Sequence, residues 1–573
     1  MVAPTPPSGK EWLNQTGRWL ARHPNWTLLL VVFAALAPFL AKPFNIDDPL
    51  FIWTAQQIHA HPADPYGFKV NWYGTAEPMW WVTQNPPLAG YYLALAAEIV
   101  GWSEFALHFA FLLPAVAAIL GTHRLACRFC HSPMLAALAT LFTPVFLVSA
   151  TTVMCDVTML AFWIWAVVLW LEGLERDDIW RLCGASLLIA LAALTKYFGA
   201  CLIPLLAACG LIEKRRSGRW IACLLIPLAA LCAYQWVTRA LYGHALLSEA
   251  TDYAKFAKGF LGGPKIASGL TALTFTGGCL AVVIFFAPRL WRMRVLALFA
   301  GGSVLLAAAN YLVGSLLKNG AIQNIPPISV EFQIIFWAVV GLGVLAMAVA
   351  DVLGRRDARS WLLALWVWGT FLFAAFFNWT VNGRSLLPMV PAVGILLARR
   401  WDQKVLTGWK TRPPSAAICL ATGAVLALLV TRADFCLALA VRQSAQQAGV
   451  KYGYGREPGV LWFQGHWGFQ FYMDALGALP LDIRHSALKP GDTLVVPENN
   501  TSLFPVNSGT SALKGTIAVS GPRWLTTWSR PAGAGFFAAA EGPLPFAFGP
   551  VPPETVSVYA LKSPAPRSAQ IPK

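Results

Sequence analysis

Two adjacent carboxylic acids, Asp47 and Asp48, follow the first long apolar run of the chain, in "AKPFNIDDPLFIW". A charge beside the hydrocarbon of a membrane is costly, so an acid in that place is a candidate for function. Asp48 stands directly before Pro49, and an acid followed by proline at the first helical position is typical of a helix N-cap. We therefore expect Asp48 mainly to cap a short amphipathic surface helix, while remaining a catalytic candidate, and Asp47 to carry the chemistry.

Three further charged side chains stand where apolar runs meet on the same side. Asp156 lies in "SATTVMCDVTMLAF", Lys196 in "LAALTKYFGACL" and Arg384 in "NWTVNGRSLLPMVPAVG". Each has a structural alternative: Asp156 as the N-cap of a span, Lys196 as a side chain that reaches the interface, and Arg384 as an interfacial anchor. Arginine binds phosphate through two parallel hydrogen bonds. We predict that Asp156 is catalytic and that Lys196 and Arg384 bind a phosphate.

The loop after the first apolar run, residues 43–87, is here called the first outer loop. It is long and aromatic ("YGFKVNWYGTAEPMWWVTQNPPLAGYY"). Trp and Tyr gather at membrane interfaces in any case, so the aromatic residues alone indicate little. The loop supplies one more candidate for the phosphate, Lys69, and three candidates for contacts with an acceptor, Glu77, Gln84 and Asn85. Acids and cations at one interface suit a substrate with a lipid tail, a phosphate and a polar group to be transferred. The acid would act as general base, and the cations would hold the departing phosphate.

The elements that must position these residues are membrane helices. The chain has 573 residues, 57% of them hydrophobic and 12% charged, which is far from the composition of a soluble domain. A net charge of +16 could suggest nucleic acid, yet no zinc-finger, RNP or helix-turn-helix pattern accompanies it. We predict an α-helical polytopic membrane protein of about thirteen spans, at 26–41, 87–124, 134–149, 155–171, 181–195, 197–212, 220–241, 267–287, 293–313, 330–350, 361–377, 385–399 and 414–433.

Basic residues divide the connecting loops into two classes. With the N-terminal segment 1–25 in the cytoplasm, the inside loops hold clusters of Arg and Lys, for example at 124–128, 214–219, 355–359 and 399–412. The outside loops hold a thinner scatter, which is the asymmetry that sets membrane orientation. An odd number of spans then places the C-terminal tail on the outer face.

The tail, residues 434–573, differs in composition from the rest of the chain. Strand-like runs ("GVLWFQG", "DTLVVPE", "TIAVSG", "VSVYAL") alternate with the amphipathic "FQFYMDALGAL", and Gly/Pro turns separate them. We predict a transmembrane domain at 26–433 followed by a soluble extracytoplasmic α/β domain at 434–573. The absence of a repeat of fixed period counts against inverted-repeat transporters.

Four stretches, taken in order, resemble a known family: "NIDDPLFIWTAQQI", "NPPLAGYYLALAAEIVG", "TTVMCDVTML" and "NGRSLLPMVPAVGILLA". They resemble the GT-C fold glycosyltransferases of family 39, the protein O-mannosyltransferases and lipid A aminoarabinose transferases, over residues of about 26–400. The tail's "VLWFQGHWGFQFYM" and "LKPGDTLVVPENN" resemble the extracytoplasmic domain of a bacterial branch.

The resemblance implies an inverting transfer of a sugar from a polyprenyl-phosphate donor, undecaprenyl phosphate in a bacterium, to an envelope acceptor at the periplasmic face of the inner membrane. It implies that Asp47 deprotonates the acceptor hydroxyl and that Asp156 supports the acceptor or the base. Lys196 and Arg384 would contact the donor phosphate. The sugar and the acceptor, a protein, a lipid or a glycan, stay open. No cofactor is firmly implied, and dependence on a divalent metal stays open too.

The sequence departs from the family pattern in two places. The family's Asp-Glu pair after the first span is Asp-Asp here, and where relatives often have Glu-Lys before Pro-Pro this chain has Gln84 and Asn85. If that lysine normally holds the phosphate, Lys69, Lys196 or Arg384 must replace it. Two alternatives to the enzyme are a transporter of polyprenyl-linked lipids or solutes without transferase activity, and an inactive scaffold in which the aspartates only cap helices. A transporter should have charged residues along a path from both faces. Here the conspicuous charges near span ends look catalytic only on the outer side, which favours the enzyme.

Overall fold

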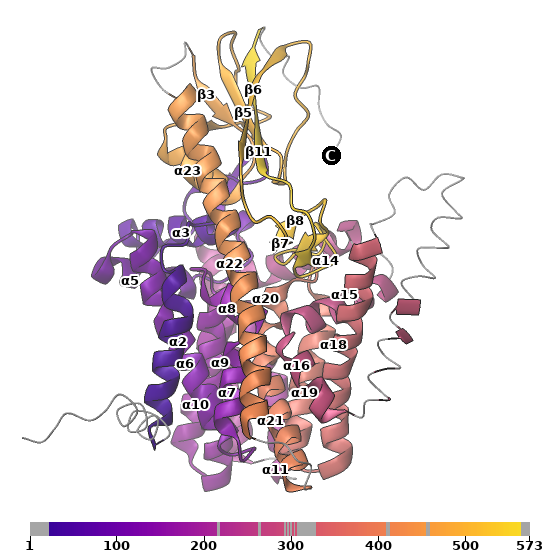
Figure 1. Ribbon diagram of the computed structural model, residues 1–573. Helices are drawn as coiled ribbons and strands as arrows, with labels where there is room; N and C mark the ends of the chain where they lie inside the picture. The colour runs from indigo at the N-terminus through magenta and orange to yellow at the C-terminus, as the bar shows by residue number, and fades with distance from the viewer. Residues whose placement is uncertain are drawn as a thin grey trace, which may run out of the picture.

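The computed structural model describes residues 22–562, apart from 215–217, 262–264, most of 292–327, 408–412 and 454–458. A tall bundle of helices carries a β-rich domain at one end, the upper end in Figure 1. Within the described residues, seven helices are long and apolar enough to cross a membrane, or up to nine if each bent pair counts as one span. The predicted helical polytopic membrane protein with a C-terminal α/β domain is thus confirmed.

The total of about thirteen spans stays a prediction. One expected span, 293–313, lies largely outside the described residues, as does most of the N-terminal segment 1–25. Two of the expected spans, 26–41 and 181–195, correspond to the shorter apolar helices Pro24–Phe39 and Ile179–Thr195. The expected span 87–124 is divided into a short helix, Leu88–Val100, and a full-length candidate span, Glu104–Ala126.

The bundle surrounds one central helix. This helix, α9 (Asp156–Arg176), is buried along most of its length, with Trp163 and Trp170 fully enclosed. A helix that is apolar on all sides belongs in a core rather than against lipid or water. It packs against α6 (Glu104–Ala126), α10 (Ile179–Thr195) and α11 (Leu202–Lys214). The other helices of the bundle include α2 (Pro24–Leu36), α5 (Leu88–Val100), α12 (Arg219–Cys223), α13 (Leu225–Tyr242), α14 (Leu246–Leu261), α18 (Ile328–Arg355), α19 (Ala358–Leu372) and α21 (Val390–Leu406).

Two helix pairs meet at sharp bends. α7 (Pro133–Leu141) and α8 (Pro144–Ala150) meet at 63°, and α15 (Lys265–Cys279) and α16 (Val282–Leu290) at 86°. Pro144 accounts for the first break, because proline lacks the N–H that would continue the helix and is well suited to start a new one. Thr143 caps that new helix by accepting a hydrogen bond from the amide of Phe146. The bend brings the end of α8 next to the start of α9.

The loop between the first two spans is folded and lies at the upper end of the bundle. It contains α3 (Asp48–Ala60), a hairpin of β1 (Lys69–Asn71) and β2 (Ala76–Pro78), and α4 (Met79–Val82). We expected the first of these helices to lie on the membrane surface. Instead, most residues of α3 are buried, because the helix packs between α5 and the C-terminal domain.

The C-terminal domain is built on a five-stranded sheet in the order β4–β3–β5–β11–β6. β3 (Leu461–Phe463) runs parallel to β4 (Leu479–Pro480) and β5 (Thr493–Pro497), while β11 (Glu554–Leu561) is antiparallel to β5 and β6 (Ser511–Val519). Helix α23 (Trp467–Ala475) follows β3. The strand-like runs and the amphipathic run of the tail coincide with these elements.

One helix, α22 (Pro413–Tyr452), belongs to both parts of the molecule. Its lower half lies in the bundle beside α8 and α16, and its upper half rises into the C-terminal domain (Figure 1). There Val441 and Ala445 pack in a small core with Val495 and Val556 of the sheet. The domain boundary that we expected at residue 434 falls inside this helix.

A second link between the two parts is the segment from Leu525 to Phe548, here called the cap segment. It contains β7 (Leu525–Thr526), β8 (Trp528–Ser529), β9 (Ala534–Gly535) and β10 (Ala547–Phe548), with β7 paired to β10 and β8 to β9. Gln333 of α18 forms two hydrogen bonds with the backbone of Phe548, at 2.8 and 2.9 Å. The cap segment therefore rests on the upper end of the bundle, as Figure 1 shows.

Candidate active site

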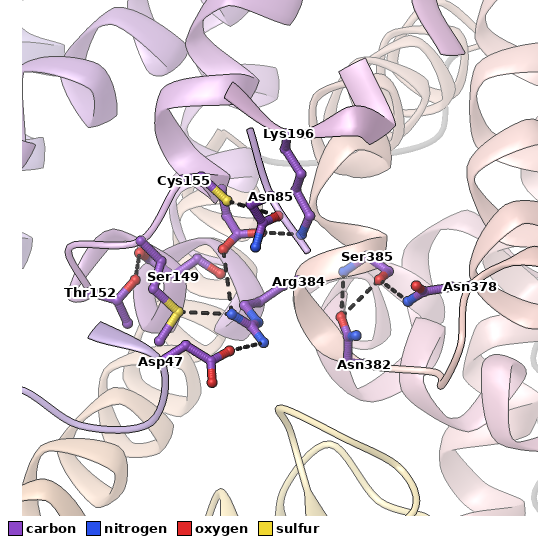
Figure 2. Close-up of polar contacts among 12 residues, drawn as sticks. Asp47, Asn85, Ser149, Thr152, Cys155, Lys196, Asn378, Asn382, Arg384 and Ser385 are labelled. Carbon is purple, nitrogen blue, oxygen red and sulfur yellow. Dashed lines mark hydrogen bonds and ion pairs between the residues drawn. The ribbon is translucent and has the colours of Figure 1, made fainter. Parts of the chain in front are cut away.

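Four charged side chains from distant parts of the chain meet at the upper end of the bundle (Figure 2). Asp47 Oδ2 accepts a hydrogen bond from Arg384 Nη2 at 2.8 Å. Asp156 Oδ1 accepts one from Lys196 Nζ at 2.6 Å, and Asp156 Oδ2 lies 4.0 Å from Arg384 Nη1. We call these four residues the charged cluster. The structure thus brings together the residues to which the sequence assigned the base, its support and the phosphate contacts.

Helix ends position three of the four residues. Asp156 is the first residue of α9, Lys196 directly follows α10, and Arg384 is the second residue of α20 (Gly383–Leu386). Asn382 caps α20 by accepting the amide N–H of Ser385 at 2.8 Å. The α9 N-cap position, by contrast, has no side-chain cap hydrogen bond, and Lys196 and Arg384 turn toward acids rather than toward the interface. The structural alternatives for these residues do not describe what their side chains contact.

The charged cluster keeps hydrogen-bonding capacity that its protein partners leave unused. Among the described residues, Asp156 Oδ2 and Arg384 Nε are buried atoms without a hydrogen-bond partner. Leaving such an atom unpaired costs about 1–3 kcal/mol, so the pair of them indicates a place for a ligand. Arg384 Nη1 contacts the sulfur of Met154 at 2.9 Å, and a thioether is a weak acceptor. A phosphate oxygen would be a stronger partner for this guanidinium.

The two acids of the cluster differ in access. The side chain of Asp47 is 26% exposed, whereas that of Asp156 is 1% exposed. Beside Asp156, the sulfur of Cys155 lies 3.7 Å from Asn85 Oδ1, so this candidate from the first outer loop does border the cluster. Tyr66 donates its hydroxyl to the backbone oxygen of Asn85 at 2.8 Å, which fixes the loop there. Of the two acids of the cluster, Asp47 is therefore the one that is open to an incoming substrate.

The charges of the cluster balance, since each acid is paired with a cation. Within the described part of the chain, no group of three or more His, Cys, Asp or Glu side chains is placed to hold a metal ion. An entering phosphate would meet cations that are already paired, and it would have to compete with the carboxylates for them.

Asp48 has a different environment from its neighbour. It is fully buried, and its carboxylate accepts the backbone N–H of Val153 at 2.9 Å and that of Asn45 at 3.1 Å. Helix α3 has Asp47 at its N-cap position and no side-chain cap hydrogen bond, so the expectation that Asp48 caps this helix is wrong. Asp48 instead ties the first outer loop to the segment before α9. Burial raises the pKa of Asp48 to about 7, against the lowering effect of Lys42 and the two amides.

A buried ion pair that the sequence did not reveal holds the same loop. Lys42 Nζ lies 2.5 Å from Asp434 Oδ2, and both side chains are only 2% exposed. The other oxygen of Asp434 accepts a hydrogen bond from Thr527 of the cap segment at 2.7 Å. The end of the first span, α22 and the C-terminal domain are thus joined within one network.

The C-terminal domain also contacts the loop through α23. The backbone N–H of Phe44 donates to the hydroxyl of Tyr472 at 2.9 Å. At Gly468 a Cβ would lie 2.3 Å from the carbonyl oxygen of Phe44, so only glycine allows this approach. Ile46 adopts a left-handed backbone conformation, with φ of 51°, which is unfavourable for a β-branched residue. The contacts on both sides therefore maintain a strained loop directly before Asp47.

The cap segment forms one wall beside Arg384. The ring of Phe537 lies 5.6 Å from the guanidinium carbon of Arg384, within the range of a cation–π interaction. The backbone N–H of Gly383 donates to the carbonyl of Phe536 at 2.8 Å, and a Cβ on Gly383 would lie 2.7 Å from the Phe536 ring. Sequence reasoning missed these contacts, because nothing in the aromatic run of the tail indicates which ring meets the arginine.

Three of the candidates from the first outer loop contact other regions. Lys69 is exposed on β1 and lines a separate cleft. Glu77 lies 3.6 Å from Arg484 of the C-terminal domain. Gln84 donates its side-chain N–H to the backbone oxygen of Trp81 at 2.7 Å. These contacts give no support to Lys69 as a phosphate ligand or to Glu77 and Gln84 as neighbours of the charged cluster.

Comparison with known proteins supports the resemblance seen in the motifs. Residues 84–242 match the family model of dolichyl-phosphate-mannose-protein mannosyltransferase. The matched residues include Asn85, Asp156 and Lys196, whereas Asp47 and Arg384 lie outside them. The match confirms the resemblance to glycosyltransferases of the GT-C fold. No curated protein matches the sequence.

Among solved structures, the chain is similar to the oligosaccharyltransferase of Archaeoglobus fulgidus in the apo form, with 14% identity, a TM-score of 0.45, and coverage of 81% of this chain and 65% of that one. It is also similar to ArnT from Cupriavidus metallidurans bound to undecaprenyl phosphate, with 14% identity, a TM-score of 0.44, and coverage of 84% and 93%. The chain therefore spans less than two thirds of the length of the archaeal oligosaccharyltransferase.

Proposed function

We propose that the protein is an inverting glycosyltransferase that moves a sugar from a polyprenyl-phosphate donor to an acceptor hydroxyl. The observation that carries this proposal is the charged cluster, in which an accessible acid lies beside two cations at one end of a membrane bundle. Such a reaction needs a base for the acceptor and positive charge for the phosphate that leaves. The match to the mannosyltransferase family model supports the same reaction class.

Asp47 is the proposed general base. As the acceptor oxygen attacks the anomeric carbon, its proton passes to the Asp47 carboxylate. The bond between that carbon and the phosphate oxygen breaks, and the polyprenyl phosphate leaves with the bonding electron pair. Attack from the side opposite to the leaving group inverts the configuration. Asp156 is too deeply buried to reach the acceptor, and we assign it the role of holding Lys196 in place.

Arg384 links donor binding to the activity of the base. In the structure its guanidinium is hydrogen-bonded to Asp47. A donor phosphate that takes over the guanidinium would release the Asp47 carboxylate, which would then be free to contact the acceptor hydroxyl.

We place the reaction on the outer face, which in a bacterium is the periplasmic face of the inner membrane, with undecaprenyl phosphate as the lipid carrier. The support is the distribution of basic residues along the sequence and the contacts of the cluster with the C-terminal domain, since Arg384 and Gly383 contact Phe537 and Phe536 of the cap segment. The opposite end holds the arginine-rich loops, for example Arg124, Arg128 and Arg181 around Glu172.

The test is release of polyprenyl phosphate by the purified protein supplied with polyprenyl-phosphate sugars and envelope extract. Asp47→Asn should lower the rate at least about 1000-fold, since a positioned general base contributes about 10²–10⁴. Glu77→Gln is the matched control, because Glu77 lies in the same loop but pairs with Arg484 and should leave the rate within twofold. A fully active Asp47→Asn protein would contradict the mechanism.

A further inference from the structure

A polar cleft whose lining does not include the charged cluster lies between the loop 43–87 and the C-terminal domain. It has a volume of about 460 Å³, within the range of small-molecule sites. One wall is the exposed side of α3 with Trp53 and Gln56, the second is β1 with Lys69 and Asn71, and the third is α23 with Gln470. None of these residues belongs to the charged cluster, so this cleft is available for a different part of a substrate.

The lining is polar and carries little charge. Its ionisable side chains are Lys69 and Asp474, and burial raises the pKa of the Asp474 carboxyl to about 7. The remaining polar groups are carboxamides, and two aromatic side chains, Trp53 and Phe68, are partly exposed at the surface of the cleft. A charged lipid head group would find at most one opposite charge here, whereas a neutral ligand rich in hydroxyl groups would find both hydrogen-bonding partners and apolar faces.

The carboxamides present oxygen atoms as acceptors. Asn71 donates its side-chain N–H to the backbone oxygen of Leu481 at 2.9 Å, and Gln57 donates to that of Asp64 at 3.2 Å, which leaves the amide oxygens to accept. Gln470 is the clearest case of an acceptor oxygen without a hydrogen-bond donor. Its side chain is 2% exposed, and among the described residues its Oε1 is a buried atom without a hydrogen-bond partner.

An unpaired buried oxygen next to a cleft calls for a donor from a ligand, because leaving it unpaired costs about 1–3 kcal/mol. Backbone and side-chain donors of the protein are not placed to meet Gln470 Oε1 within the described chain. Sugar hydroxyls are donors that can meet several carboxamide oxygens at once, while aromatic rings cover the apolar faces of the sugar ring. Sites built to hydrogen-bond hydroxyl groups discriminate strongly against ligands that lack them.

We infer that this cleft binds a neutral oligosaccharide, and that the oligosaccharide is the acceptor. The second half of this statement rests on the proposed transferase function. Gln56 lies nine residues after Asp47 along α3, which corresponds to about 13 Å in a helix at about 1.5 Å per residue. A chain of sugar units that occupies the cleft can therefore extend along α3 and place its terminal hydroxyl at Asp47. The acceptor is on this basis a glycan rather than an unmodified protein.

The experiment measures binding of the purified full-length protein, in detergent, to an array of neutral oligosaccharides composed of hexose, N-acetylhexosamine and pentose units. We expect binding to at least one of them. Gln470→Leu and Gln56→Ala should each weaken this binding at least tenfold. Gln56 is exposed, so its replacement tests the cleft even if the buried Gln470 variant were to fold poorly. Gln447→Ala, an exposed glutamine on α22 outside the cleft, is the matched control and should bind as the unmodified protein does.

Release of polyprenyl phosphate is measured on the same preparations, which separates the two proposals. Donor turnover without binding to any oligosaccharide of the array would overturn the cleft assignment and leave the transferase proposal standing. Binding that Gln470→Leu and Gln56→Ala do not change would overturn it as well. Binding that both substitutions weaken, with no turnover of any donor, would support a saccharide site and contradict the transferase.

Discussion

The two ends of α9 each bury a carboxylate among cations, but they satisfy it differently. At the lower end Glu172 accepts hydrogen bonds from Arg124 at 2.9 Å, Arg128 at 3.2 Å and Arg181 at 2.7 Å. At the upper end, one oxygen of Asp156 accepts a hydrogen bond from Lys196, and the other has no hydrogen-bond partner among the described residues. The same helix therefore carries a completed ion cluster at one end and an incomplete one at the other.

The difference separates structural from functional charges. Three donors occupy the two oxygens of Glu172, and the cluster joins α6, α9 and α10. The upper cluster leaves Asp156 Oδ2 and Arg384 Nε unpaired, and it includes an acid, Asp47, that is open to solvent. Burial and charge alone would make the two ends equal candidates for a functional site. The ends differ because the upper cluster has buried polar atoms without hydrogen-bond partners among the described residues.

Among the substitutions that compare the two ends of α9, Arg384→Gln at the upper end is expected to have the largest effect, although a smaller one than Asp47→Asn. Loss of the guanidinium removes the main stabilisation of the leaving phosphate, and removing one such donor typically costs about 10²–10³ in rate. We expect that loss in kcat/KM for a polyprenyl-phosphate sugar, with a thermal unfolding midpoint close to that of the unmodified protein. A protein that unfolds early but retains its specific activity would show that this cluster, too, is only structural.

Glu172→Gln should give the opposite pattern. The substitution removes the carboxylate that three arginine side chains share, although Arg128 keeps Glu175 and Arg181 keeps Asp178 as partners. Breaking a buried pair costs about 3 kcal/mol. The expected result is a clear fall of the thermal midpoint in detergent, with kcat changed less than twofold. Arg176→Gln is the control for the loss of one charge on the same helix, because Arg176 forms no ion pair with Glu172 in the described structure. A loss of activity as large as that of Arg384→Gln would remove the distinction between the two ends.

A third buried carboxyl, for which the described residues provide no ion pair, extends the comparison. Glu554, at the start of β11, is 5% exposed and accepts a hydrogen bond from Asn499 at 3.2 Å. Burial raises the pKa of Glu554 to about 7 from 4.5. Between these two values the folded protein holds a proton that the unfolded chain has lost, so stability falls as pH rises through this window.

Glu554→Gln should abolish that fall, because glutamine does not ionise. We expect the variant to gain about 2 kcal/mol relative to the unmodified protein between pH 5 and pH 8, from the size of the pKa shift. Thermal midpoints of both proteins across this pH range give the measurement. Parallel pH curves for Glu554→Gln and the unmodified protein would mean that Glu554 is ionised throughout.

The smallest effect is expected from Phe537→Leu, which weakens the wall beside Arg384 without removing a charge. A cation–π contact of this kind contributes about 1 kcal/mol, so kcat/KM for the donor should fall about fivefold. Phe435→Leu is the matched control, since Phe435 lies under Arg432, 5.0 Å from its guanidinium, outside the charged cluster. Equal effects of the two substitutions would show that the loss of an aromatic ring, and not its position at the cluster, causes the change.

Much of the upper cluster could be predicted from the sequence because its members share a local signature. Asp156, Lys196 and Arg384 each interrupt or end an apolar run, and the cost of a charge there is independent of the rest of the fold. The strands of the tail were predictable for the same reason, since alternating side chains and turn residues are local features. The length of α22 was not, because its upper half is polar on one side and resembles a soluble segment.

What could not be predicted depends on contacts between distant segments. The Lys42–Asp434 pair joins residues 392 positions apart, and neither residue has a local pattern that indicates the other. Asp48 was misinterpreted because the Asp-Pro pattern describes how a helix starts, whereas the amide that Asp48 binds comes from Val153, before another helix. The same limit applies to Phe537, whose position beside Arg384 depends on how the cap segment folds back.

The position of the cap segment in the chain has a consequence for the order in which the protein is made. Asp47, Asp156 and Lys196 are synthesised early, but Thr527 and Phe537, which contact Asp434 and Arg384, come close to the end of the sequence. During biosynthesis the helices that carry the four charges are therefore complete before the wall that encloses them exists. The surroundings of Arg384 are finished only when the cap segment has been made and has folded back onto the bundle.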